Sequence, residues 1–140
     1  MALETTIEQA TGRVPITVIA LDGELDASNF NELIASTRGL YDSGTRNLLL
    51  DLTNLRFMAS SGLVALHSIL RLMHGEAPPD PEAGWGALHS LGLDVSGGGE
   101  MQTEVQLCGA QGAVERVLTR TGLSQLFITH PDRASAIAAF

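Results

Sequence analysis

Positive charge and aromatic side chains are scarce in this sequence. Eight Lys and Arg residues stand against 16 Asp and Glu residues, the formal net charge is −8, and Phe, Trp and Tyr make up only 4% of the chain. Non-specific binding of nucleic acids needs a basic surface, and binding of single strands also needs aromatic side chains on which bases stack. The composition therefore argues against a nucleic-acid-binding protein.

Long apolar runs and cysteine pairs are also missing. No stretch approaches the roughly 20 apolar residues that span a membrane, and the first residues form neither the basic nor the apolar part of a signal peptide. The single cysteine, Cys108, cannot form an internal disulfide. We therefore expect a cytoplasmic protein without a membrane span, in which Cys108 is a small core residue.

The sequence lacks the motifs of common enzyme classes. It has no phosphate-binding glycine loop between a strand and a helix, no GxSxG nucleophile and no HExxH, and its four histidines show no metal-like spacing. Asp22, Glu24 and Asp26 lie close together, but such a cluster is more often a solvated loop, a helix-cap group or a partner-binding edge than an acid–base pair. We therefore expect no enzymatic activity, no cofactor and no bound metal.

Two kinds of apolar pattern alternate along the chain. Branched or consecutive apolar residues predict strands at 14–21, 46–52, 103–108 and 126–128, with an antiparallel strand at 3–10 before them. Helical spacing of apolar residues predicts helices after Asp26, from Ser60, around 114–121 and at 134–140. The alternation predicts a single α/β domain over residues 1–140, with a mostly parallel mixed sheet of about five strands and about four helices.

Residues 76–100 interrupt this pattern. The segment contains Pro78, Pro79 and Pro81 and three consecutive glycines at 97–99, a composition typical of loops. We therefore predict a loop insertion at about 76–100.

The most informative segment is 51–63. An apolar strand is followed by a connection, in which Leu55 and Phe57 are expected to point inward, and then by a helix that opens with Ser60 and Ser61. Either serine could simply cap the helix by accepting a backbone N–H bond. Alternatively, a phosphate on an exposed serine would gain from the helix dipole and add about −1.5 to −2 charges without melting the helix. The segment therefore predicts either a structural cap or a phosphorylation switch.

Three segments, in this order, resemble those of STAS domains of the anti-sigma factor antagonist family. Residues 23–26 are similar to the family's G-E-L-D, residues 57–63 resemble its F-M-D-S-S-G-L, and residues 121–123 resemble its S/T-G-L. The resemblance covers nearly the whole chain apart from 76–100, and the first two motifs together are its specific part. Ala59 departs from the pattern, because the family has an acidic residue there.

The resemblance implies a partner-switching function. Its phosphate acceptor would be Ser60, with Ser61 as the alternative, and Asp26 would cap the first helix, contact the partner, or do both. The implied partner is a serine-kinase anti-sigma factor with a histidine-kinase-like ATPase fold, and a PP2C-type phosphatase would restore the complex that phosphorylation breaks. The expected docking surface includes the exposed face of the helix that starts at Ser60 and these residues: Asp22, Glu24, Asp26, Ala59, Ser60, Ser61, Gly62 and Leu63.

Other functions remain open at the level of sequence. The chain could be a non-phosphorylated STAS scaffold, or a ligand-sensing module in a larger signalling or transport complex, in which Ser60 merely caps a helix. It could also be a small-ligand or lipid sensor that uses residues 76–100 as a lid.

Overall fold

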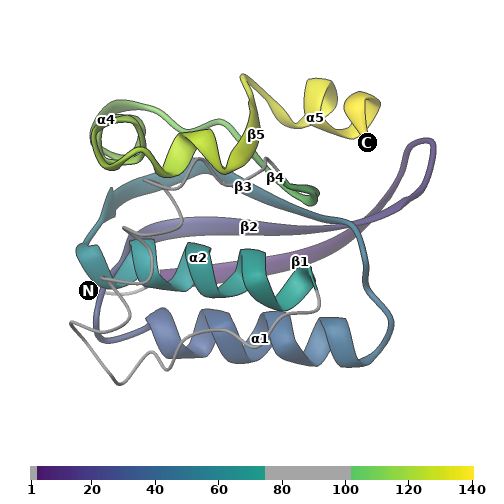
Figure 1. Cartoon of the computed structure of the whole chain (residues 1–140), viewed down its shortest axis with the longest axis horizontal. Helices are drawn as coiled ribbons and strands as arrows, with labels where there is room; N and C mark the ends of the chain where they lie inside the picture. The colour runs from purple at the N-terminus through teal and green to yellow at the C-terminus, as the bar shows by residue number, and fades with distance from the viewer. Residues whose placement is uncertain (1–2, 75–101) are drawn as a thin grey trace.

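A computed structural model describes residues 3–74 and 102–140 as one sheet with helices packed against it (Figure 1). The predicted α/β fold, with five strands in a mixed sheet and four helices, is confirmed for these residues. The insertion predicted at 76–100 lies outside them. The elements in chain order are β1 (Leu3–Thr11), β2 (Pro15–Leu25), α1 (Phe30–Asp42), β3 (Leu48–Met58), α2 (Ser60–Met73), β4 (Gln102–Cys108), α4 (Gly112–Thr121), the 3₁₀ helix η2 (Leu123–Gln125), β5 (Phe127–His130) and α5 (Arg133–Ala139).

The strands lie in the sheet in the same order as in the chain. β1 is antiparallel to β2, while β2, β3, β4 and β5 run parallel to one another. Each parallel strand is joined to the next by a helix, and such crossovers are right-handed, so α1, α2 and α4 cover the same face of the sheet. The carboxyl ends of β2 to β5 therefore all meet at one edge, where the ends of the strands lead into loops.

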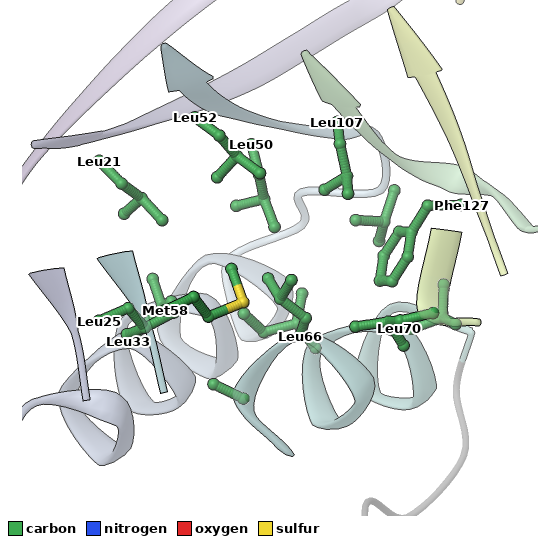
Figure 2. Packing of buried hydrophobic residues seen from close by; sticks show 14 of the residues in the cluster. Leu21, Leu25, Leu33, Leu50, Leu52, Met58, Leu66, Leu70, Leu107 and Phe127 are labelled. Carbon is green, nitrogen blue, oxygen red and sulfur yellow. The ribbon is translucent and has the colours of Figure 1, made fainter. Parts of the chain in front are cut away.

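One core cluster fills the space between this face and the three helices. Leu48, Leu50 and Leu52 of β3 point into it, while Leu49 points to the opposite face, as the period of two in a strand requires. Figure 2 shows Leu66 and Leu70 of α2 pointing toward the sheet residues. The apolar residues whose helical spacing predicts α2 are all buried, and they are Leu63, Leu66, Ile69, Leu70 and Met73.

The helix α2 is buried far beyond this stripe. Eleven of its 14 residues are buried, and Ser60 is its single exposed residue. With α1 beside it (Figure 1), α2 has little surface left for a partner, and the docking role of its exposed face stays a prediction. What α2 offers to solvent is its amino-terminal end.

Two strands are longer than the sequence predicts. Residues 22–26 were expected to form a loop and 53–59 a connection, but β2 continues to Leu25 and β3 to Met58 because their ends pair with each other. Between Ala20 and Glu24 the register slips twice, and each slip gives β3 one extra residue. Such bulges shift the inward–outward alternation. Leu55 is inward as predicted, but the prediction for Phe57 is wrong, because its ring is 45% exposed.

The opposite face of the sheet is closed by α5, which is tied to it by an ion-pair cluster. Asp51 of β3 accepts hydrogen bonds from Thr53 N (3.0 Å) and Oγ1 (2.6 Å) and from Arg133 Nε (3.0 Å). Arg133, the first residue of α5, also pairs with Glu8 of β1. Burial alone would raise the pKa of Asp51, but the bonds from Thr53 and Arg133 outweigh it and hold the pKa below its usual value. The cluster thus joins the edge strand, a central strand and the last helix.

We predict that Arg133→Met destabilises the protein by about 2 kcal/mol at pH 7, because Asp51 stays buried without its cation. Since the folded-state pKa of Asp51 is lowered, its contribution is complete above the unfolded value of about 4 and is lost as the pH falls through the folded pKa. Urea unfolding of both proteins between pH 7 and pH 3 should show the difference shrinking on acidification. Arg38→Met, on the exposed side of α1, is the control. An unchanged difference at pH 3 would contradict this account.

Candidate functional site

The carboxyl ends of β2 and β3 bring the two motifs of the resemblance together. Glu24 lies opposite Phe57, and Leu25 lies opposite Met58. The backbone N–H of Ala59 then donates to the carbonyl of Leu25 at 2.9 Å. The acidic segment 22–26 and the start of α2 are therefore neighbours on one edge of the sheet.

Ser60 is the first residue of α2 and is exposed. The N-cap position is taken by Ala59, whose backbone is extended (φ −81°, ψ 175°), and among the described residues no side-chain cap bond forms there. The prediction that Ser60 or Ser61 caps the helix is therefore wrong, because both lie inside it. The Ser60 hydroxyl thus stands beside a helix end whose positive dipole has no side-chain acceptor.

Gly62 and Leu63 lie beneath this surface and are buried. A Cβ atom at Gly62 would come within 2.5 Å of Met58 Cγ and 3.1 Å of two Leu25 side-chain atoms. The absence of a side chain at Gly62 therefore lets α2 approach the ends of β2 and β3. Gly62 and Leu63, which are two of the predicted partner-binding residues, therefore support Ser60 from the buried side of the helix. Ser61 is half-buried beside Ser60.

Asp26 and Asn29 shape the turn between β2 and α1. Asp26 Oδ1 accepts from Ser28 N (2.9 Å) and Ser28 Oγ (2.6 Å), and these bonds lower the pKa of Asp26. Asn29, rather than Asp26 or Ser28, holds the N-cap position of α1, although its side chain makes no cap bond there. Instead its Nδ2 donates to the carbonyl of Glu24 at 2.9 Å, and its Oδ1 accepts from Asp26 N at 3.0 Å.

Sequence reasoning missed Asn29, which is buried and bonds to the backbone on both sides of Leu25. A signal was present, since an Asn directly before a helical apolar pattern favours the N-cap position. It also missed Arg56, whose Nη1 lies 3.5 Å from Asp22 Oδ1 in an exposed ion pair.

We define the docking face as the solvent-facing residues at this edge. Its apolar centre is Phe57, which with Ile7 makes up the exposed large apolar side chains of the described residues. Glu24 lies directly across from Phe57 and is half-buried, whereas Asp22 is exposed. The complete docking face consists of Asp22, Glu24, Asp26, Arg56, Phe57, Ala59 and Ser60.

We predict that Gly62→Ala destabilises the protein by about 1 to 2 kcal/mol, because overpacking against Met58 and Leu25 exceeds the gain in helix propensity. Gly39→Ala in α1 is the matched control, because a Cβ atom there has nothing within 4 Å, and it should stabilise by up to about 1 kcal/mol. Thermal or urea unfolding distinguishes the two. If both substitutions stabilise the protein, the close approach at Gly62 is not a constraint.

Comparisons with known proteins agree with this geometry. The STAS domain family model matches residues 8–75, which include β2, the whole docking face and α2. A comparison with curated protein sequences found no match. Within residues 3–74 and 102–140, no helix is both long and apolar enough to cross a membrane.

Solved structures share the fold over almost the whole chain. An anti-sigma factor antagonist from Mycobacterium paratuberculosis is 20% identical with a TM-score of 0.67, and the alignment covers 99% of this chain and 93% of that one. The Bacillus cell fate determinant SpoIIAA in its phosphorylated form is 18% identical with a TM-score of 0.59, covering 97% and 98%. The STAS domain of a SulP transporter from Vibrio cholerae is 19% identical with a TM-score of 0.54, covering 89% and 77%.

At these low identities the solved structures show only that the fold is shared. The name STAS domain comes from the family model. Residues 8–75 are therefore similar to STAS domains, and the chain shares its fold with the solved anti-sigma factor antagonists.

Proposed function

We propose that this chain is an anti-sigma factor antagonist that docks on a serine-kinase anti-sigma factor and is released by phosphorylation at Ser60. The observation that carries the proposal is the exposed Ser60 at the uncapped start of an otherwise buried helix. On this proposal the chain is a cytoplasmic regulatory protein with no catalytic role. ATP and its metal belong to the kinase, which has a histidine-kinase-like ATPase fold, and a PP2C-type phosphatase reverses the modification.

The docking face has the composition of a small interface. Phe57 provides an apolar anchor, and aromatic residues surrounded by polar ones are common where binding energy concentrates. Glu24, Asp26 and Asp22 make the surroundings acidic, and one described cation on this face, Arg56, is already paired with Asp22. The face therefore favours a partner with basic side chains around an apolar hollow.

Phosphorylation would change this surface without changing the fold. The helix dipole and the free N–H groups at the start of α2 favour a phosphate on Ser60, so the helix should remain intact. The phosphate adds about −1.5 to −2 charges to a face that is already acidic. A partner surface that fits close to the Ser60 hydroxyl would be excluded by the volume and charge of the phosphate, so the complex would dissociate.

We predict that Ser60→Ala abolishes phosphate transfer from the kinase while binding persists, and that Ser60→Asp weakens binding about tenfold or more because it adds a charge to the contact. The partner is recovered from a lysate of the native organism with wild-type bait and identified by mass spectrometry. The purified partner is then mixed with each variant. Intact-mass measurement after addition of ATP detects phosphate on the chain, and calorimetry measures binding. Ser36→Asp, on the exposed side of α1, controls for added charge, and Ser61→Ala controls for the acceptor.

Phosphate transfer that persists in Ser60→Ala and disappears in Ser61→Ala would assign the acceptor to Ser61. Equal binding by wild type, Ser60→Ala and Ser60→Asp would contradict the switch.

We predict that Phe57→Ala raises the Kd for the same kinase about tenfold or more, because a truncated anchor costs on the order of 2 kcal/mol. Since the ring is 45% exposed, the fold should lose much less stability than it would for a buried Phe. Ile7→Ala is the matched control, because Ile7 is equally exposed but belongs to β1. If both variants bind like the wild type, Phe57 lies outside the interface.

Two observations favour a second function: one residue departs from the family's sequence pattern, and a transporter domain has a similar structure. Ala59 occupies the position where the family has an acidic residue, and a transporter STAS domain shares the fold. The alternative is a non-phosphorylated STAS scaffold, or a ligand-sensing module, in a larger signalling or transport complex. In that case all Ser60 baits recover the same proteins, and no phosphate appears on the chain after incubation with ATP and those proteins.

A further inference from the structure

A pocket of about 630 Å³ lies at the carboxyl ends of β4 and β5, and no docking-face residue lines it. Its apolar floor is formed by the buried residues Leu107 and Leu118. The volume is within the range of small-molecule sites. The pocket opens beyond the carboxyl ends of two neighbouring parallel strands.

The wall between β4 and β5 is held in place by specific contacts. The N–H of Gly109 donates to the carbonyl of His130 at 3.1 Å, and His130 Nε2 lies 2.7 Å from Gln106 Oε1. Gly109 has a φ of +74°, and a Cβ atom there would lie 2.2 Å from Thr53 Oγ1, so this turn packs directly on β3. A pocket with a fixed wall binds without the cost of ordering it.

The polar groups of the pocket are rich in hydrogen-bond acceptors. Thr119, Ser124 and Thr129 contribute hydroxyl groups, and Glu115 is the one lining residue, among those the structure describes, with a fixed charge. Because Gln106 Oε1 only accepts, His130 Nε2 donates to it, and this bond orients the ring. The lining therefore complements a ligand that donates hydrogen bonds and carries positive charge.

Two neighbouring features limit the ligand. Cys108 also lines the pocket, but burial raises the pKa of its thiol to about 12, so it is not a nucleophile for a covalent adduct. Arg116 and Arg120 form a shallower hollow with Glu115 and Thr119 on the outer side of α4. Because these arginines repel cations, a cation can approach Glu115 favourably only from the pocket side. It must also be small.

We propose that the pocket between β4, β5 and α4 binds a small organic amine in its protonated form, with the ammonium group on Glu115. This inference goes beyond the proposed function, because it involves neither Ser60 nor the docking partner. The site would be a non-covalent binding site and not a catalytic one.

The test is a ¹H–¹⁵N NMR titration of the full chain with three four-carbon probes of different charge. 1,4-Diaminobutane should bind with a Kd on the order of 1 mM, as expected for a ligand of six heavy atoms. It should shift the amides of pocket residues such as Ala110 and Thr129. 1,4-Butanediol and succinate should bind at least about tenfold more weakly, because they lack the charge that pairs with Glu115.

Two variants and a control complete the test. Glu115→Gln should weaken diaminobutane binding about tenfold, whereas Glu32→Gln, which removes an acidic residue from the first turn of α1, should leave it unchanged. Thr129→Phe should block the pocket. Because Thr129 is exposed and lies in a strand, where aromatic residues are accepted, the melting temperature should be preserved. The proposal is overturned if diaminobutane causes no shifts at pocket residues, if butanediol binds as well, or if Glu115→Gln binds like the wild type.

Discussion

The pairing of the ends of β2 and β3 is the constraint on which the rest of the site depends. The bond from Ala59 N to Leu25 O fixes where α2 begins, and the missing side chain at Gly62 allows the helix to lie against both strand ends. Asn29 fixes the other side of the same joint through its bonds to Glu24 O and Asp26 N. The first residue of α2 is thereby held at the surface while most of the helix is buried.

This arrangement separates the proposed phosphorylation site, Ser60, from the core. Close-packed interiors resist change, because any displacement of buried leucines leaves voids or overlaps. A phosphate at Ser60 instead meets solvent, the positive end of a helix and a neighbouring acidic surface, none of which requires the core to move. Arg133 and Asp51 hold the opposite face closed, so both faces of the sheet stay intact while the charge of one edge changes.

The sequence correctly predicts those strands and buried residues that a local residue pattern determines. Three consecutive leucines at 48–50 report a strand covered on both faces, and the spacing from Leu63 to Met73 reports the buried side of α2. It fails where pairing decides, since residues 22–25 become part of a strand only because β3 lies beside them. Leu55 points inward because the first register slip shifts the alternation, and the second slip restores it, so that Phe57 points outward; no local feature of the sequence encodes those slips. The position of Ala59 as the N-cap follows from the same pairing.

We propose that phosphorylation at Ser60 alters the surface and leaves the fold unchanged. The most direct measurement is a comparison of ¹H–¹⁵N spectra of the chain with serine and with phosphoserine at position 60, introduced during synthesis so that no kinase is needed. The account predicts shifts confined to residues 22–26 and 56–63, with the amides of Leu50, Leu107 and Phe127 unmoved. Shifts spread across the sheet core, or melting of the first turn of α2, would contradict it.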